Sequence, residues 1–211
     1  MSMDHGADEP RTGIRWLLVN IAGGGSSASS LDAWRRLRGL GAHYLQPAVC
    51  LLPERDDTTS AVARTLARVE RGGGHARVFP IGRLDEASER DVIAAFSAER
   101  SDEYDQVVDR TRGFVGEITM ERERRRVSYT EVEESRVDLR RLQRWLASIR
   151  KRDYFDAPGY DKAAGAVARC ERLLTEFEAE AYEVEVHPTD EDLARAPWRR
   201  RLRALAGPAG R

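Results

Sequence analysis

The sequence predicts an α+β fold, in which a ferredoxin-like βαββαβ half is followed by an antiparallel helical bundle. Short apolar runs bounded by turn residues alternate with amphipathic segments up to residue 83, in the order β-α-β-β-α-β. From residue 84 onward, the apolar residues recur at helical spacing. With 211 residues, of which 41% are hydrophobic, the chain is long enough to bury a substantial core.

The first half begins with the apolar run IRWLLVN at residues 14–20, which is typical of a buried strand. The Gly/Ser-rich loop AGGGSSASS follows at residues 22–30. Its place between a strand and a helix resembles that of a phosphate-binding loop, but it has neither a GKS or GKT ending nor the spacing GxGxxG. A flexible connection is the simpler interpretation.

A helix is predicted after this loop, because Ser29 and Asp32 resemble a capping box. We expect Gly39 and Gly41 to end the helix, because glycine adopts the left-handed conformation that is common after a helix. The predicted apolar face of this helix consists of Leu31, Trp34, Leu37 and Leu40.

Three further strands and one helix complete the first half. Pro47 separates two short apolar runs and predicts a hairpin between them. The glycines at residues 72–74 are expected to stop the second helix. The predicted boundaries are strands at residues 42–46, 48–52 and 75–81, and a helix that starts at Thr58 or Thr59.

The second half is predicted to contain three long helices joined by short connections, which together make an antiparallel bundle. The apolar stripe of the first helix starts at Tyr104 and ends near Met120. Thr130 and Glu133 resemble a capping box at the start of the second helix. The sequence DAPG at residues 156–159 is expected to break the chain before the third helix.

These patterns divide the chain into four parts. They are a disordered tail at residues 1–12, a ferredoxin-like domain at 13–83, a helical bundle at 84–183 and an arginine-rich C-terminal tail at 184–211.

Composition narrows the class of protein. Charged residues make up 34% of the chain, yet the formal net charge is -1, which argues against a globally basic nucleic-acid binder and leaves room for local basic patches. The two cysteines, Cys50 and Cys170, are far apart and fit a reducing compartment. The N-terminus has no apolar signal core, and no apolar run approaches the roughly 20 residues that a membrane helix needs. We therefore expect a cytoplasmic protein without membrane contact.

No motif indicates catalysis, a metal or a cofactor. Neither CxxC nor HxxxH occurs, and the four histidines show no ligand spacing. There is no GxSxG motif, and the paired carboxylates lie along arginine-rich segments that are typical of solvated helix faces. We therefore predict no catalytic residue, no metal site and no cofactor.

Arginine clusters are the remaining candidates for a binding site, because one guanidinium can bind two oxygens of a phosphate or another oxyanion. Acidic residues interleave with the arginines everywhere except in the tail, so a solvated surface is the alternative interpretation. The candidate contacts for DNA or an oxyanion are Arg35, Arg36 and Arg38 on the first helix, Arg150, Lys151 and Arg152 after the middle bundle helix, and Arg199, Arg200 and Arg201 in the tail.

Three stretches, in this order, resemble the N-terminal domain of ChrB, the regulatory protein of bacterial chromate-resistance operons. They are WLLVNI, WRRLRGLGAHYLQPAVCLLP and LQRWLASIRKRDYF, and the resemblance covers roughly residues 14–183. It implies a cytoplasmic regulator that responds to chromate and governs an efflux transporter. Full-length members of this family carry a second, C-terminal domain, on which sensing or repression can depend.

From this resemblance and the arginine clusters we predict a regulator associated with chromate resistance, which acts by DNA or protein contact rather than by catalysis. The sequence has no helix-turn-helix pattern that would read DNA bases. One alternative is an oligomeric interaction module without DNA binding, formed as a homodimer through the sheet or the bundle. The other is a metal-dependent nuclease-like enzyme, although Asn20 rather than a carboxylate stands at the end of the first strand.

Chromate is a tetrahedral dianion, so a site for it needs two or more cationic donors that point inward. The resemblance singles out Arg36, from WRRLRGLGA, and Arg152, from RKRDYF, with Asp153 orienting an arginine. The alternative is that Arg152 and Asp153 form an ordinary ion pair that joins the bundle to the sheet.

Overall fold

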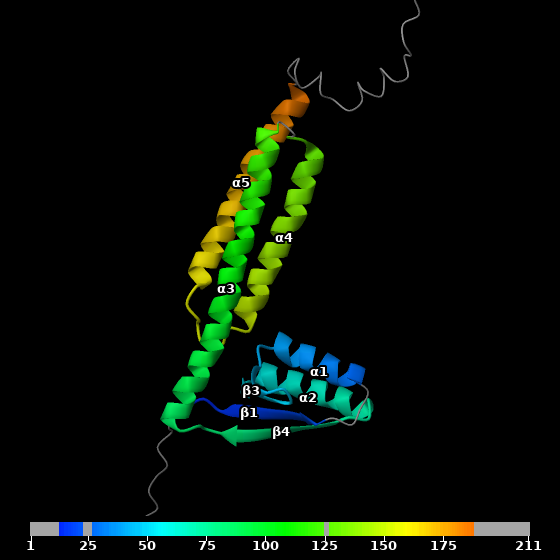
Figure 1. The fold of residues 1–211 in the computed structure, drawn as a ribbon, viewed down its shortest axis with the longest axis vertical. Helices are drawn as coiled ribbons and strands as arrows, with labels where there is room; N and C mark the ends of the chain where they lie inside the picture. The colour runs from blue at the N-terminus through cyan, green and yellow to red at the C-terminus, as the bar shows by residue number, and fades with distance from the viewer. Residues whose placement is uncertain (1–12, 23–26, 125–126, 188–211) are drawn as a thin grey trace, which may run out of the picture. The chain divides into compact units, whose positions relative to one another are not determined.

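The computed structural model describes residues 13–22, 27–124 and 127–187 of the chain (Figure 1). Within these residues the structure has one four-stranded antiparallel sheet and five helices, which confirms the α+β class of the prediction. The predicted disordered tail at residues 1–12 and the C-terminal arginines from Arg195 onward lie outside the described residues.

Contacts between residues divide the chain into two compact units. Unit 1 extends to Asp102 and also includes Ile149–Pro158. Unit 2 consists of Glu103–Ser148 and the chain from Gly159 onward. The two units are described separately below.

Unit 1 contains the sheet, whose strands follow the order β2-β3-β1-β4 with antiparallel neighbours throughout. On the central strand β1, Val19 lies opposite Cys50 of β3 on one side and Val78 of β4 on the other. The elements are β1 (Trp16–Ala22), α1 (Ser27–Gly39), β2 (His43–Gln46), β3 (Val49–Pro53), α2 (Asp56–Arg71) and β4 (His75–Gly82).

Both helices of the first half start earlier than predicted. Helix α1 begins at Ser27, so Ser29 lies inside its first turn. Helix α2 begins at Asp56, and Thr58 occupies its third position, where its hydroxyl accepts a hydrogen bond from the Arg55 N–H at 3.0 Å and donates one to the Pro53 carbonyl at 2.6 Å. Acidic residues in the first turn of α2 suit the positive end of the helix dipole, so the helix can start before the threonines.

One face of the sheet packs against α1 and α2. The prediction that Leu31 belongs to the apolar face of α1 is wrong, because Leu31 is 45% exposed and Ala33 is buried instead. This core consists of Leu17, Val19, Ala33, Leu37, Ala42, Cys50, Leu52, Val62, Leu66, Val69 and Ala76.

The other face of the sheet carries a second apolar cluster built around Trp16, Leu51 and Phe96. Phe96 lies on α3 (Glu86–Glu123), within the part of that helix that belongs to unit 1. Tyr154 and Phe155 pack against the same cluster, and the ring centroids of Phe96 and Phe155 are 5.5 Å apart. Residues more than 50 positions away along the chain therefore complete the core of unit 1.

Strand β4 forms one edge of the sheet, and three of its apolar side chains, Val78, Phe79 and Ile81, are exposed by 36–44%. Pro80 lies opposite Leu17 on β1. Proline has no N–H to donate, so its place on an edge strand costs the sheet little and removes one donor that another strand would use.

Unit 2 contains most of α3 together with α4 (Tyr129–Lys151) and α5 (Tyr160–Val186) (Figure 1). Lys162 of α5 pairs with Asp105 of α3 at 2.9 Å, and Arg122 of α3 pairs with Glu180 of α5 at 2.7 Å, so α3 and α5 run in the same direction. Within the described residues, no helix has a stretch that is both long enough and apolar enough to span a membrane.

The boundaries of these helices depart from the predictions by a few residues. Helix α3 ends at Glu123 rather than near Met120. Helix α4 begins at Tyr129, and the Ser128 hydroxyl accepts a hydrogen bond from the Glu131 N–H at 3.4 Å, so Thr130 is not the cap. The predicted break at residues 156–159 is confirmed by positive φ values at Asp156 (51°) and Gly159 (106°).

Two glycines end the helices of the first half in the same way. Gly41 after α1 has φ 79° and Gly73 after α2 has φ 78°. In each case the next residue donates its N–H to a carbonyl five positions back, Ala42 to Leu37 and Gly74 to Val69, both within 3.1 Å. These are Schellman motifs, which need a left-handed residue at the glycine position.

The two glycines differ in their surroundings, and this difference gives a matched test. A β-carbon at Gly41 would lie 3.0 Å from the Arg152 β-carbon and 3.1 Å from its carbonyl oxygen, whereas one at Gly73 would have no neighbour within 4 Å. We expect Gly73→Ala to lower the free energy of unfolding by about 1 kcal/mol, which is the backbone cost alone. Gly41→Ala should cost at least about 1 kcal/mol more, because it also overpacks. Urea unfolding followed by circular dichroism measures both, and equal losses would contradict the close packing at Gly41.

Candidate functional site

The outer sides of α1 and α2 carry a group of exposed arginines, here named the α1–α2 arginine surface. Acidic residues are fewer on these helices, and three of the four lie in the first or last turns of α2. Asp32 is the acidic residue of α1. The surface consists of Arg35, Arg36 and Arg38 from α1 and Arg64, Arg68 and Arg71 from α2.

Asp32 neutralises only part of this charge. Its carboxylate accepts a hydrogen bond from the Arg36 Nε at 2.7 Å. This bond lowers the pKa of Asp32 below its usual value, and the positive charges of Arg36, Arg68 and Arg35 lower it further. Arg38 lies over the ring of Trp34, 4.8 Å from the ring centroid. The predicted residues Arg35 and Arg36 therefore lie near Arg68 of α2, whereas Arg38 is an exposed arginine that lies against Trp34.

A second group of polar residues surrounds the turn between α1 and β2 and is here named the glycine-turn cluster: Gly41, Glu99, Arg100, Arg152 and Tyr154. Gly41 is buried, and its α-carbon packs so closely against Arg152 that an added β-carbon would also lie 3.1 Å from the Arg100 Nη1. The cluster draws on α3 and on the segment after α4, and all of its members belong to unit 1. It therefore brings two of the three stretches that carry the family resemblance into contact.

Arg100 is the most buried charged residue of this cluster. Its side chain is 7% exposed, and its Nη2 lies 3.2 Å from the Glu99 Oε2. The other oxygen of Glu99 lies 2.8 Å from the His43 Nδ1. The Glu99 carboxylate thus contacts both the Arg100 guanidinium and the His43 imidazole beside the turn.

Tyr154 connects the cluster to the end of α1. Its hydroxyl donates a hydrogen bond to the Leu40 carbonyl at 2.6 Å. Burial raises the pKa of Tyr154 from its ordinary value of 10.0 to about 12, and the nearby charge of Asp57 acts in the same direction. The Arg55 guanidinium lies 5.7 Å from the centroid of the Tyr154 ring.

Asp153 holds the segment that follows α4. Its carboxylate is 1% exposed and accepts hydrogen bonds from the Ala157 N–H at 3.0 and 3.2 Å. The Arg150 guanidinium lies 3.4 Å from Asp153 and 2.8 Å from Asp156. Lys151 is exposed. Asp153 thus contacts Arg150, an arginine of the predicted set.

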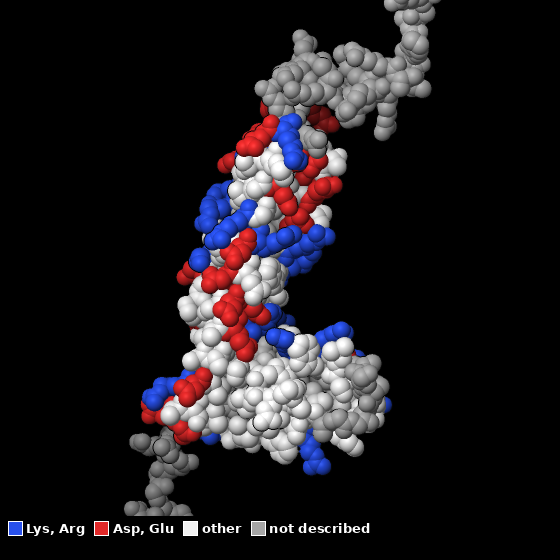
Figure 2. All heavy atoms as spheres, viewed as in Figure 1, with Lys and Arg blue, Asp and Glu red and all other residues white. Residues whose placement is uncertain are grey.

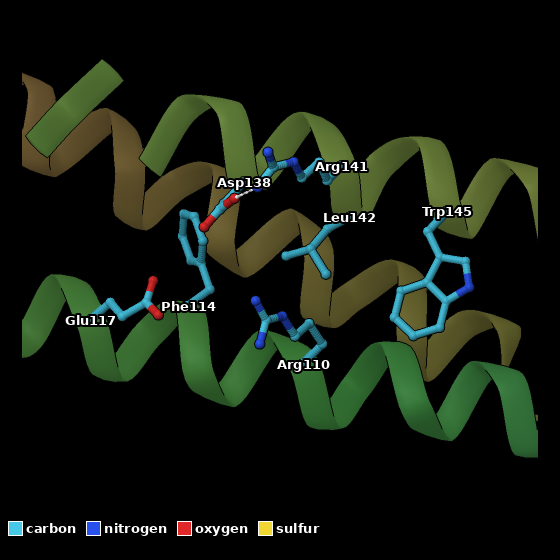
Figure 3. A pocket seen from close by; sticks show the side chains of 7 residues that line it. All are labelled: Arg110, Phe114, Glu117, Asp138, Arg141, Leu142 and Trp145. Atoms are coloured by element: carbon cyan, nitrogen blue, oxygen red, sulfur yellow. Dashed lines mark hydrogen bonds and ion pairs between the residues drawn. The ribbon is translucent and has the colours of Figure 1, made fainter. Parts of the chain in front are cut away.

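In unit 2, a groove of about 220 Å³ lies between α3 and α4. Figure 3 shows Phe114, Leu142 and Trp145 along the groove, with Arg110 pointing into it between Phe114 and Trp145. Figure 2 shows basic and acidic side chains interleaved over the helices of this unit. The groove is lined by Arg110, Phe114, Glu117, Asp138, Arg141, Leu142 and Trp145.

The cysteines and the candidate metal ligands show no sign of a reactive centre in the part of the chain that the structure describes. Both thiols are buried, and burial raises the pKa of Cys50 to about 12 and also raises that of Cys170. A protonated, buried thiol behaves as a small apolar side chain. Among the described residues, no three His, Cys, Asp or Glu side chains form a group that could hold a metal ion.

The predictions from sequence did not include Arg100 or Glu99. A signal for Arg100 exists, because Val92, Phe96 and Arg100 recur at a spacing of four and place an arginine on an apolar helix face. The tail candidates Arg199, Arg200 and Arg201 lie outside the described residues.

Comparison with known proteins gives a match to a family model. A family model described as "Protein ChrB, N-terminal" matches residues 31–188, which is most of the chain. The matched range contains both Gly41 and Arg152 and starts after the WLLVNI stretch. No curated protein and no solved structure matches the chain.

The hydrogen bond of Tyr154 predicts a dependence of stability on pH. We expect Tyr154→Phe to lower the free energy of unfolding by about 1 kcal/mol near neutral pH, because it removes one hydrogen bond and keeps the ring. The folded state raises the pKa of Tyr154, so the hydroxyl contributes fully below pH 10.0 and its contribution is lost as the pH rises toward about 12. The difference between wild type and variant should therefore shrink above pH 10.0.

Urea unfolding on both sides of this pH range measures the difference. Tyr182→Phe is the control, because Tyr182 is 65% exposed. An equal loss in the control, or a difference for Tyr154→Phe that is constant with pH, would contradict the role given to the hydroxyl.

Proposed function

This chain belongs to the family of the N-terminal part of protein ChrB, and on that premise we propose that it is a cytoplasmic regulator associated with chromate resistance. It acts by contact with DNA through the α1–α2 arginine surface rather than by catalysis. The observation that carries this proposal is the set of six exposed arginines on two adjacent helices, with Asp32 the one acidic residue of α1.

The chemistry of this surface suits the DNA backbone. A guanidinium fork binds two phosphate oxygens, and each arginine that neutralises a phosphate releases a condensed counterion. Asp32 neutralises the positive charge of Arg36, with which it pairs. Arg35 and Arg68 act on Asp32 through their positive charges alone, without a hydrogen bond to it. Contacts with phosphates position a protein on the duplex without reading bases. We propose that this surface supplies affinity and orientation in that way.

We also propose a ferredoxin-like fold for unit 1 and an antiparallel bundle for the helices of unit 2. The element order βαββαβ and the strand order β2-β3-β1-β4 support the first interpretation. The Arg136–Glu178 pair between α4 and α5 supports the second, since it joins the start of α4 to the end of α5.

The glycine-turn cluster is the place where we propose that chromate or another oxyanion acts. Arg152 approaches the Gly41 turn with its β-carbon and carbonyl oxygen, and Arg100 approaches it with its Nη1. The RKRDYF stretch that carries the family resemblance singles out Arg152. Arg36, the other predicted donor, forms an exposed pair with Asp32. An oxyanion that binds between two guanidiniums would gain charge-assisted hydrogen bonds from both.

The DNA proposal predicts a change in salt dependence. In binding titrations between about 50 and 200 mM salt, the double variant Arg35→Ala/Arg68→Ala should reduce the slope of log K against log salt by about 2, because each lost phosphate contact removes about 0.9. Arg90→Ala is the control, since Arg90 lies outside this surface and pairs with Glu86 at 2.7 Å. A wild-type protein that binds no DNA at low salt, or a double variant with an unchanged slope, would overturn the proposal.

The oxyanion proposal predicts stabilisation by mass action. Chromate should raise the Tm of the wild type in a concentration-dependent way, and Arg152→Ala should abolish the rise. Arg112→Ala, at a 75% exposed arginine paired with Asp109, should keep the rise. If Arg152 is purely structural, the variant melts at a lower temperature and the rise persists. The absence of any rise in the wild type would end the proposal for this chain.

A further inference from the structure

We propose that the groove between α3 and α4 is the contact surface of a homodimer, in which a second copy of this chain places the same groove against it about a two-fold axis. The proposal concerns unit 2 alone and does not depend on DNA or oxyanion binding. It rests on the arrangement of apolar and charged side chains along the groove (Figure 3).

The groove has an apolar floor, and Arg110 points into the groove beside Leu142 (Figure 3). Phe114 from α3 and Leu142 from α4 are 5% and 4% exposed and form its floor. Trp145 borders the same groove and is partly exposed. Aromatic side chains in the middle of a contact patch are typical of the residues that contribute most to association.

Along α3, charges of opposite sign lie on either side of Phe114 (Figure 3). Arg110 and Glu117 are both exposed, border the groove from α3 and are seven residues apart, so they lie about two helical turns from each other on one face. Within the described residues, neither forms an ion pair. On the α4 side, Asp138 and Arg141 neutralise each other at 2.6 Å.

This pattern is complementary to itself. In a two-fold contact the same patch occurs on both partners, so a surface that pairs with itself must place unlike groups at equal distances from the axis. An axis at the level of Phe114 brings Arg110 of one copy opposite Glu117 of the second copy, and Glu117 of the first opposite Arg110 of the second. Two ion pairs would then flank an apolar centre. The occupant that this groove fits is therefore a second copy of the chain.

Charge reversal in the full chain tests the proposal by sedimentation velocity over a concentration series. Arg110→Glu and Glu117→Arg should each weaken the dimer about tenfold or more, because each turns two attractive contacts into repulsive ones. The double variant Arg110→Glu/Glu117→Arg should recover most of the lost affinity, because the charges are exchanged and still opposite. Arg112→Glu is the control on another face of α3 and should leave the dissociation constant unchanged.

Three results would overturn the proposal. One is a wild-type chain that stays monomeric up to about 1 mM. The second is a single reversal with no more effect than Arg112→Glu. The third is a double variant that dimerises no better than the single variants, while circular dichroism shows that all of them are folded.

Discussion

The hydrogen bond from the Tyr154 hydroxyl to the Leu40 carbonyl is the contact on which the architecture of unit 1 depends. Leu40 stands where α1 gives way to the sheet, and Tyr154 contacts both apolar clusters of the unit. The bond satisfies a carbonyl that the end of the helix leaves without a partner. Beside this bond, Arg152 approaches Gly41 so closely that a residue with a side chain would crowd it. The helix end, the sheet and the segment after α4 are thereby held by one group of contacts.

Arginine has three different physical roles in this chain. Arg100 is buried beside Glu99, where a charge needs a partner to offset the loss of hydration. Arg35 is exposed, and its interaction with neighbouring charges is weakened by solvent and salt. Arg110 lines a groove with an apolar floor, where the contribution of its charge to binding depends on the molecule that the groove contacts. The net charge of -1 conceals these differences, because it averages over surfaces that face different surroundings.

Local signals predicted the fold well, and distant contacts account for most of what was missed. The ends of α1 and α2 were found because Gly41 and Gly73 carry a conformational requirement that the sequence displays. The start of α2 was misplaced because Thr58 competes with neighbouring polar residues as a cap, and the choice depends on its bonds to Pro53 and Arg55. The pairing of His43 with Glu99 joins positions 56 residues apart, and no periodicity in either segment reports it. The sequence could indicate that the predicted arginines are exposed, but it could not indicate which residues lie beside them.

The order of segments in unit 1 has a consequence for how the chain is made. The sheet and its first two helices are complete once residue 82 has been synthesised, but one of their two apolar faces still needs Phe96, Tyr154 and Phe155. Those last two residues follow the whole of α4, so the ribosome adds about 70 more residues before the second face can close. During that interval Trp16 and Leu51 lack the part of their cover that Tyr154 and Phe155 supply. The nascent chain therefore carries an exposed apolar sheet face for several seconds, which is the kind of surface that chaperones bind.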